Sequence, residues 1–343
     1  MPPRHAALAV LVTLVWGANF VVIDAGLGDL PPLTFVVLRF VLVLVPAVFL
    51  VPRPAIRWRD LAAVGLLMSA AQFGLLYTSL HLGMPPGLAS LVLQAQVVFT
   101  VVIAAVAIRE RPTVPQQVGV LVGLVGLGIV ALGRSAATPL LALTLCVAAA
   151  LAWAAGNVVA RRVGTASGLG LTVWSALFVP LPVLALSLVV DGPRAIATGL
   201  SHIGWATLLS SAYTAYLCSL FGYGVWNSLL ARHQASAVVP FTLLVPVSGI
   251  ATAWIAYGER PGAASAVGGV VLMAGVGVTV LAARRRARVV AAPGGVAALA
   301  APGPAGAPRA GTGASAGVGL VSNATKSGGR LPPAPSTCQD GHT

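Results

Sequence analysis

The stretch at residues 91–130 reads LVLQAQVVFTVVIAAVAIRERPTVPQQVGVLVGLVGLGIV, and it consists of two apolar runs joined by the turn Glu110-Arg111-Pro112. Each run approaches the length of about twenty residues that an α-helix needs to cross the hydrocarbon core of a bilayer. Similar runs follow one another from about residue 5 to about residue 283. The pattern predicts an all-α polytopic membrane protein.

The composition agrees with this class. Charged residues make up 8% of the chain, against roughly 25% in soluble domains, and the mean hydropathy is +0.95. The net charge of +13 comes mainly from arginines at the ends of apolar runs, and these arginines do not form a basic patch interleaved with aromatic residues. The charge therefore indicates membrane topology and contact with anionic membrane lipid, and it predicts no nucleic-acid partner.

We expect ten transmembrane helices, with short loops between them. Their predicted ranges are 5–24, 31–51, 59–80, 85–108, 114–133, 139–160, 170–190, 204–229, 235–257 and 263–283. If the N-terminus is cytoplasmic, thirteen arginines lie on the cytoplasmic side, and only Arg134, Arg194 and Arg260 lie on the other side. This positive-inside bias predicts a multi-pass protein of the cell inner membrane with cytoplasmic N- and C-termini.

An internal repeat organises the chain. Residues 91–130 align without a gap on residues 240–279, and Glu110-Arg111-Pro112 falls on Glu259-Arg260-Pro261. Because each half contains an odd number of predicted helices, the second half enters the membrane in the opposite orientation. Inverted repeats are typical of secondary transporters that work by alternating access.

The repeat defines the expected domains. Residues 1–134 form the first five-helix repeat and residues 138–284 form the second. Residues 285–343 are rich in Ala, Gly and Pro, and we expect them to be a disordered cytoplasmic tail because they offer little apolar surface to bury.

Polar side chains inside the predicted helices are candidates for a substrate cavity, because an unpaired polar group in lipid is costly. Tyr216, Ser219, Tyr223 and Asn227 recur at spacings of three and four, which puts them on one face of an α-helix. The other cavity candidates are Asn19, Gln72, Gln94 and Asn157. For each of them, a hydrogen bond between helices is the alternative role.

Two glutamines of the fourth predicted helix are expected to have different roles. Ser90 and Gln94 share one helix face, whereas Gln96 and Thr100 share a face on roughly the opposite side. The two pairs should therefore not face the same cavity, and one glutamine should join helices.

Arg39 is the one charge well inside a predicted helix, about 12 Å of helix from its outer end. We expect it to extend outward and pair with Asp24 at the end of the preceding helix. The alternative role is a counter-charge for a substrate carboxylate.

No Asp, Glu or His occupies the middle of a predicted helix, where a proton relay normally has a titratable group. Proton coupling would therefore use Asp24, Glu110 or Glu259 near helix ends, and facilitated diffusion is the alternative. Both glutamates are also expected to pair with the neighbouring arginine. The sequence contains no clustered nucleophile and base and no metal-ligand set, so we expect no enzyme activity, no catalytic residue, no cofactor and no metal.

Proline and glycine mark irregular helices in both halves. Pro85-Pro86-Gly87 begins the fourth predicted helix, and Pro240 and Pro246 lie in its repeat partner. Matched irregularities of this kind point to the substrate region of a transporter. Gly119 and Gly123 are expected to let two helices approach closely.

Several motifs carry a resemblance to a known family. They are Trp16-Gly17-Ala18-Asn19-Phe20, Leu38-Arg39-Phe40, Ala71-Gln72-Phe73, Gly83-Met84-Pro85-Pro86-Gly87, Val173-Trp174-Ser175-Ala176-Leu177, Gly222-Tyr223-Gly224-Val225-Trp226, Leu243-Leu244-Val245-Pro246-Val247 and the two Glu-Arg-Pro turns. With them, residues 5–284 resemble the EamA-type branch of the drug/metabolite transporter superfamily. Within that branch the chain most resembles the bacterial exporters of O-acetylserine and cysteine.

The resemblance implies a secondary transporter that exports small zwitterionic metabolites, namely amino acids of the cysteine pathway, from the cytoplasm. Neutral amides, hydroxyls and aromatic rings suit such an amino-acid-like partner. A sibling exporter of other amino acids or drugs is the nearest alternative, and a non-transporting receptor or scaffold is an alternative of a different class. The sequence indicates no particular oligomeric state.

Overall fold

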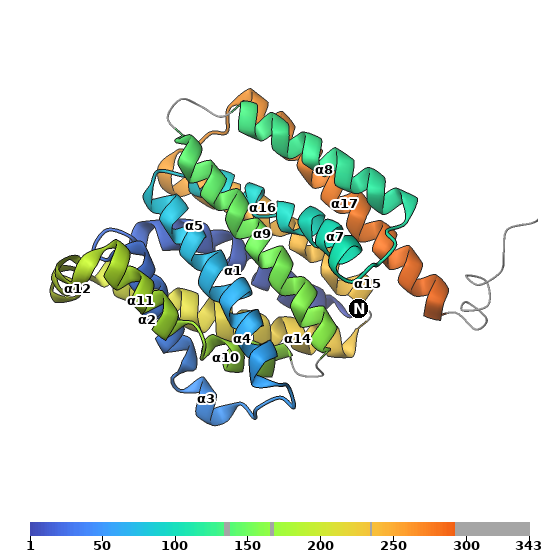
Figure 1. Ribbon diagram of the computed structural model, residues 1–343. Helices are drawn as coiled ribbons and strands as arrows, with labels where there is room; N and C mark the ends of the chain where they lie inside the picture. Colours follow the sequence, from blue (N-terminus) through green and yellow to red (C-terminus); the bar gives the residue numbers. More distant parts are fainter. Residues whose placement is uncertain (134–137, 165–167, 234, 292–343) are drawn as a thin grey trace, which may run out of the picture. The chain divides into compact units, whose positions relative to one another are not determined.

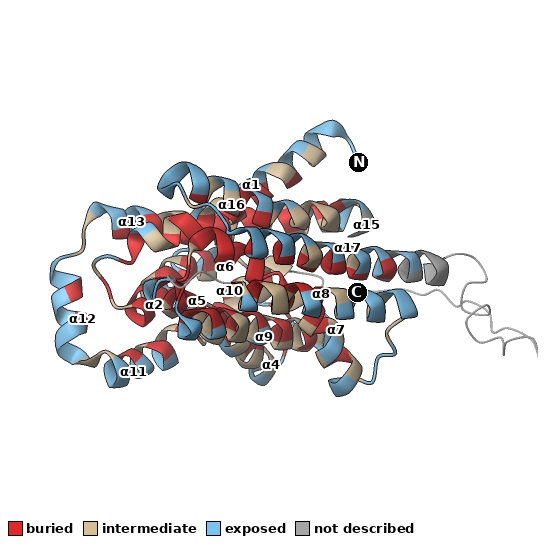
Figure 2. Ribbon diagram, turned by 90° about the horizontal axis from the view of Figure 1, so that it is seen from above, coloured by how far each residue is buried: buried red, intermediate tan, exposed pale blue. Residues whose placement is uncertain are grey.

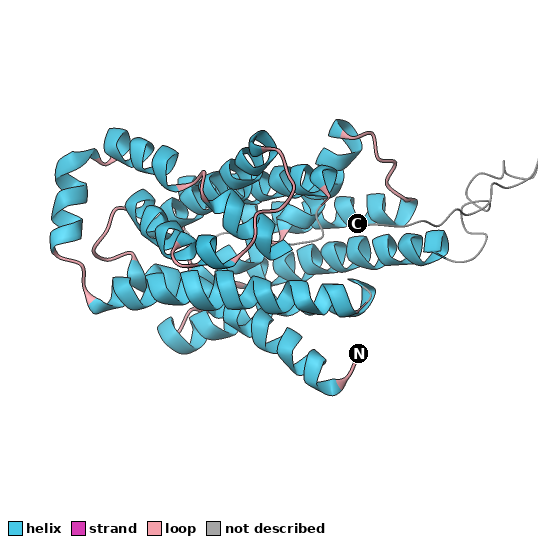
Figure 3. Cartoon of the chain, turned by 90° about the horizontal axis from the view of Figure 1, so that it is seen from below, coloured by secondary structure: helices cyan, strands magenta, loops and turns pink. Residues whose placement is uncertain are grey.

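The computed structural model describes residues 1–133, 138–164, 168–233 and 235–291, and in these ranges it contains helices and loops but no strand (Figure 3). The expected all-helical class is confirmed. In chain order the elements are α1 (Pro3–Gly26), α2 (Pro32–Leu44), α3 (Ala47–Leu50), α4 (Trp58–Val64), η1 (Gly65–Ala71), α5 (Gln72–His81), α6 (Pro86–Val92), α7 (Ala95–Ala107), α8 (Val114–Leu132), α9 (Leu140–Val163), α10 (Gly168–Ala176), α11 (Pro180–Val190), α12 (Gly192–Ser201), α13 (Trp205–Ala212), η2 (Tyr213–Gly222), α14 (Tyr223–Arg232), α15 (Ala235–Val238), η3 (Val239–Leu243), α16 (Leu244–Tyr257) and α17 (Ala263–Ala291).

Among the described residues, eight helices are long and apolar enough to cross a membrane. The bent pair α10 and α11, which meet at 41°, brings this number to nine if the two form one span. The structure therefore does not confirm the expected ten. The predicted helix at 204–229 falls on α13, η2 and α14, which follow one another without a loop but are rich in Ser, Thr and Tyr.

Large apolar side chains cover much of the outer surface. Leu132 is 90% exposed, and Phe49 and Val189 are each 83% exposed. In Figure 2 the buried residues lie on the inward faces of the helices. A water-soluble surface rarely carries so much apolar area, so these helices are suited to surrounding lipid.

The helices α8 and α17 lie side by side (Figure 1) because glycines line their contact. A Cβ atom at Gly126 would lie 2.2 Å from the backbone nitrogen of Leu272, and one at Gly119 would lie 2.3 Å from the hydroxyl of Thr279. Only a residue without a side chain fits at these positions. The expected packing role of Gly119 is thereby confirmed.

Helix irregularities occur at matching places in the two halves. The third expected helix of each half contains a π-helical segment, η1 or η2. The fourth expected helix is interrupted between α6 and α7 in the first half and by the 3₁₀-helix η3 in the second half. Such local changes of helix type often accompany functional sites.

The last described helix is longer than expected. α17 continues to Ala291, beyond the expected end of the second repeat at 284. The rest of the expected tail, residues 292–343, lies outside the described residues.

Candidate functional site

A cavity of about 320 Å³ is lined by residues of α1, α2, η1, α5, α6, α7, α9, η2, α14, η3, α16 and α17. Of the sequence-predicted cavity residues, Asn19, Gln72, Gln94, Asn157 and Tyr223 line it. Its volume is at the lower end of the range of about 300–1,000 Å³ that is typical of small-molecule sites. A second hollow near Val247, Trp254 and Glu259 is larger, about 440 Å³, but Val247 and Trp254 are exposed on the lipid-facing surface. The inner cavity is therefore the candidate site.

Each half of the chain contributes a tryptophan and an asparagine from its first long helix to the cavity wall. Trp16 and Asn19 enter from α1, and Trp153 and Asn157 enter from α9. Asn157 Nδ2 donates a hydrogen bond of 2.8 Å to Gln96 Oε1, and Asn19 Oδ1 accepts a contact of 3.3 Å from the thiol of Cys218. The two asparagines thus serve both proposed purposes, because they line the cavity and also connect neighbouring helices.

Gln94 and Gln96 both line the cavity, so the expectation that they face different sides is wrong. The chain between α6 and α7 forms tight turns, in which the amide of Gln96 bonds the carbonyl of Leu93 and the amide of Val97 bonds the carbonyl of Gln94. These bonds span three residues instead of four, which changes the rotation per residue. The geometry of an uninterrupted α-helix, on which the expectation rested, does not apply here.

The expected stripe of Tyr216, Ser219, Tyr223 and Asn227 does not form one wall. Tyr223 lines the cavity, whereas Ser219 contacts Arg39 beside it. Tyr216 is 38% exposed, and Asn227 lies against Gly168 of α10. The prediction assumed one continuous α-helix, but Tyr216 and Ser219 lie in η2, a π-helix whose wider turn changes the rotation per residue. Asn227 lies in the α-helix α14 and contacts α10 instead of the cavity.

Arg39 also lines the cavity, and the expected ion pair with Asp24 is wrong. Its guanidinium donates hydrogen bonds to the hydroxyls of Tyr77, at 3.1 Å, and Ser219, at 3.3 Å. Asp24 interacts instead with the hydroxyl of Tyr257. In the part of the chain that the structure describes, the one ion pair joins other residues, Arg161 and Glu110.

Glu259 holds the start of α6. Its carboxylate accepts the backbone N–H groups of Gly87, at 3.0 Å, and Leu88, at 3.2 Å. Burial is the main reason that the pKa of Glu259 is raised, and the nearby charge of Asp24 adds to this, although the two N–H donors act in the opposite direction. Glu259 therefore bridges two segments of the chain through backbone atoms and is not bound to Arg260 as expected.

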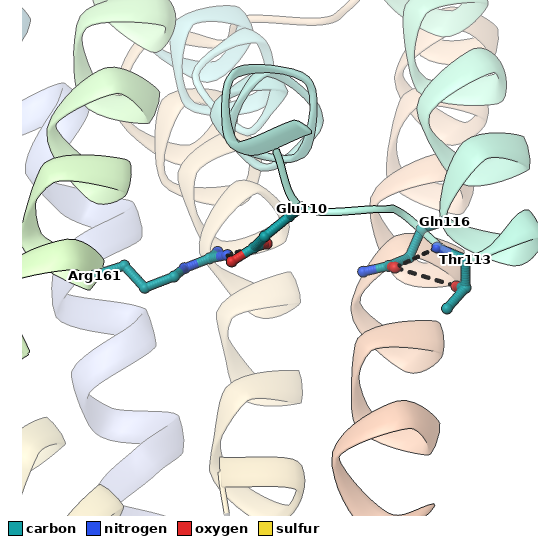
Figure 4. A network of polar contacts seen from close by, with 4 residues as sticks. All are labelled: Glu110, Thr113, Gln116 and Arg161. Atoms are coloured by element: carbon teal, nitrogen blue, oxygen red, sulfur yellow. Dashed lines mark hydrogen bonds and ion pairs between the residues drawn. The ribbon is translucent and has the colours of Figure 1, made fainter. Parts of the chain in front are cut away.

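Glu110 lies in a different environment. Figure 4 shows its carboxylate against Arg161 of α9, with a closest distance of 2.9 Å. The two side chains are 46% and 50% exposed, so this pair contributes little to stability. In the same picture the side-chain oxygen of Gln116 accepts hydrogen bonds from the backbone N–H and the hydroxyl of Thr113, which caps the first turn of α8.

Sequence reasoning did not identify several aromatic residues of the wall, namely Phe20, Phe73 and Trp226. Taken alone, their sequence signal is that of ordinary core residues. The similar placement of Trp16 with Asn19 in one half and Trp153 with Asn157 in the other is a sequence signal that could have pointed to an aromatic wall. Among the described residues there is no group of three His, Cys, Asp or Glu side chains that could hold a metal ion.

The known proteins that are similar to this chain in sequence are described as transporters or efflux pumps. The sequence pattern of the EamA-like transporter family matches residues 4–132 and 140–281. A probable amino-acid metabolite efflux pump of Escherichia coli (strain K12) is 38% identical over 288 residues, which cover 82% of this chain and 96% of that protein. Its counterpart in Salmonella typhimurium (strain LT2) is 40% identical, with the same coverage.

More distant proteins show the same type of similarity. A probable terminal-alkyne amino-acid exporter of Streptantibioticus cattleyicolor is 28% identical over 78% of this chain and 90% of that protein. One solved crystal structure aligns with a TM-score of 0.53 at 20% identity, and the alignment covers 83% of this chain and 99% of that one. At this identity the structural likeness supports the fold alone.

Proposed function

Because this chain belongs to the EamA-like transporter family, a family of membrane transporters, we propose that it exports small zwitterionic metabolites from the cytoplasm. Its substrates are amino acids of the cysteine pathway, O-acetylserine and cysteine. The observation that carries this proposal is the cavity itself, which is small and is lined by amides, aromatic rings and a single cation. Proteins named amino-acid metabolite efflux pumps are similar over nearly their full length.

The proposed mechanism is alternating access between two inverted five-helix repeats. Ten membrane-spanning segments with cytoplasmic termini give this arrangement, and they include α13, η2 and α14 as the eighth. The matched helix irregularities in the two halves support it, because repeat transporters commonly place such irregularities at the substrate site.

The site residues have separate proposed roles. Asn19, Gln72, Gln94, Asn157 and Tyr223 bind the solute with neutral polar groups. Ser219 supports Arg39, while Tyr216 and Asn227 serve in helix contacts. Glu259 with Asp24 closes one end of the transport path, and Glu110 acts at the other end.

The contacts of Glu259 support a gating role. Gly17 and Gly249 lie so close to neighbouring helices that a Cβ atom at either position would be within 2.4 Å of a serine hydroxyl. Glu259 bonds the backbone of Gly87 near this tight packing of α1, α6 and α16. Movement of α6 away from α16 would break the Glu259 contacts and open that end of the path.

The test of the proposed function is uptake of labelled O-acetylserine and cysteine into everted membrane vesicles, with and without a proton gradient. We expect uptake above that of vesicles without the protein. Stimulation by an inside-acid gradient indicates exchange for protons, and equal uptake without the gradient indicates facilitated diffusion. If neither compound is taken up, with or without the gradient, the assigned substrates are refuted.

A matched pair of variants links uptake to the cavity. Gln94 lines the cavity, whereas Gln117 lies at the start of α8 and bonds the exposed carbonyl of Pro112. Gln94→Ala should reduce uptake per molecule, and Gln117→Ala should not. Aromatic walls also suit bulkier amino acids or drugs, so competition by such compounds is the outcome that favours the sibling-exporter alternative.

A further inference from the structure

Arg39 is a buried cation whose hydrogen-bond partners are all neutral. Its side chain is 2% exposed and lines the cavity. The guanidinium bonds the hydroxyls of Tyr77 and Ser219, and its Cζ lies 3.9 Å from the centre of the Phe73 ring. Within the described residues, Nε of Arg39 has no hydrogen-bond partner.

The position of the guanidinium is fixed by its surroundings. The hydroxyl of Ser219 donates to the backbone carbonyl of Thr214 at 2.9 Å, and the hydroxyl of Tyr77 interacts with the side chain of the same residue. Both hydroxyls therefore direct their oxygen lone pairs toward Arg39. The cation is held in place before any ligand arrives.

Within the described ranges, Arg39 forms no ion pair with an acidic side chain. A smaller cavity of about 60 Å³ also has Arg39 in its wall. Among the described residues that line either cavity, none is an Asp or a Glu. Hydroxyls and an aromatic face compensate a buried cation only in part. A guanidinium has five N–H donors, of which the two hydroxyls use two, so donors remain for a planar anion.

We propose that Arg39 binds the carboxylate of the transported solute, and that the site requires this carboxylate but does not require a free ammonium group. The inference rests on the proposed function, because it places the solute in the same cavity. The planar fork of a guanidinium matches the two oxygens of a carboxylate. The selected substrate class is thus a small carboxylic acid, of which a zwitterionic amino acid is one case.

Aromatic rings in the cavity wall explain why the ammonium group matters less. The rings of Trp16 and Tyr223 have centroids 5.3 Å apart, and Trp16 and Trp226 have the same separation. Such rings attract a cation by cation–π interaction, but the described residues of the wall offer it no opposite charge. Loss of the ammonium should therefore weaken binding less than loss of the carboxylate.

Three related compounds carry the carboxylate and the ammonium group in different combinations. O-acetyl-L-serine has both a carboxylate and an ammonium group. N-acetyl-L-serine is its isomer and has the carboxylate alone, whereas O-acetyl-L-serine methyl ester has the ammonium alone. Binding to the purified full-length protein is measured from the shift of the thermal unfolding midpoint with ligand concentration.

For the unmodified protein, we expect the two acids to bind within about tenfold of each other and the methyl ester to bind at least about tenfold more weakly. This series needs no variant, so it does not depend on how a substitution affects folding. An ester that binds as tightly as the acids would overturn the proposal. An N-acetyl isomer that fails to bind would overturn the part concerning the ammonium.

Substitutions of Arg39 test whether this side chain causes the preference for acid over ester. Arg39→Gln should abolish the preference for acid over ester, and Arg39→Lys should keep part of it because the charge remains without the planar fork. Gln117→Ala is the control, because Gln117 lies at the start of α8 and does not line the cavity, so the preference should persist in that variant. Full preference in Arg39→Gln would refute the assignment, and if that variant does not fold, a preference unchanged in Arg39→Lys would do so.

A transport measurement on the same preparation distinguishes this inference from the proposed function. If reconstituted protein moves labelled O-acetylserine and the ester competes as well as the acid, the inference fails and the function stands. If the acids bind with the expected preference but no labelled O-acetylserine crosses the membrane, the proposed function fails and Arg39 remains a carboxylate site.

Discussion

Side chains in the cavity wall are held by neighbours from other helices. Trp16 of α1 packs against Tyr223 of α14, and its indole N–H donates to the carbonyl of Cys218 at 3.0 Å. The side-chain amide of Asn157 in α9 donates to the side-chain oxygen of Gln96 in α7. Each residue therefore shapes the cavity and also fixes the position of a second helix.

For single residues, the clearest test uses Tyr223 of α14 and Tyr216 of η2, which lie seven residues apart. Tyr223→Ala should lower export per molecule at least several-fold, because it removes a ring from the cavity wall, while protein abundance in the membrane stays near normal. Tyr216→Ala is the control, since Tyr216 is partly exposed and does not line the cavity. Export of O-acetylserine, normalised to membrane protein, measures both. Equal normalised export in the two variants would remove Tyr223 from the site.

Polar residues of the site were the easiest to predict, because an amide within an apolar helix is conspicuous. Asn19, Gln72 and Asn157 were predicted in this way, and they line the cavity. Arg39 was assigned the wrong partner, since sequence alone does not show that Asp24 interacts with Tyr257 or that two hydroxyls surround the guanidinium.

At the scale of helices, close packing and local changes of helix type position the site. Residues of α8 and α17 approach closely at glycines, and the interruption between α6 and α7 turns both glutamines to the cavity. The long helices were predictable from apolar runs. The π-helical segments were not, because no residue type specifies the wider turn, and they changed which residues of η2 face inward.

Helix packing is tested by Gly126→Ala in α8. The added Cβ would lie 2.2 Å from the backbone of Leu272, so the helices must separate, and we expect a loss of about 1–3 kcal/mol in the free energy of unfolding. Gly128→Ala is the matched control because its Cβ would have no atom within 4 Å, and alanine favours a helix. Thermal unfolding of purified protein compares the two. A Gly126→Ala variant as stable as Gly128→Ala would contradict the close approach.

The contacts of Glu259 give a pH dependence with a defined sign. Because burial raises its pKa in the folded protein, the ionised form lowers stability at high pH, and this cost disappears as pH falls through the raised pKa. The unfolding midpoint of the unmodified protein should therefore rise, relative to that of Glu259→Gln, as the pH is lowered. The control is Glu110→Gln, whose parent side chain is 46% exposed. A difference that is constant with pH, or that grows in the opposite direction, would contradict the burial of Glu259.

At the scale of the whole molecule, the sequence repeat and the arginine distribution together imply an orientation in the membrane. Reporter fusions after Gly133 should report the periplasmic side, and fusions after Ala283 should report the cytoplasmic side. The proposed inverted arrangement requires an odd number of crossings in each half. A periplasmic C-terminus would therefore refute both the ten crossings and the inverted arrangement.

On the proposed function, this chain by itself carries a small amino acid across a membrane. Counterflow in proteoliposomes that contain only the purified protein tests it most directly. Vesicles preloaded with unlabelled O-acetylserine should transiently accumulate external labelled O-acetylserine, and preloaded cysteine should drive the same accumulation. If labelled O-acetylserine enters no faster than into protein-free vesicles with both preloads, the chain does not transport this amino acid by itself.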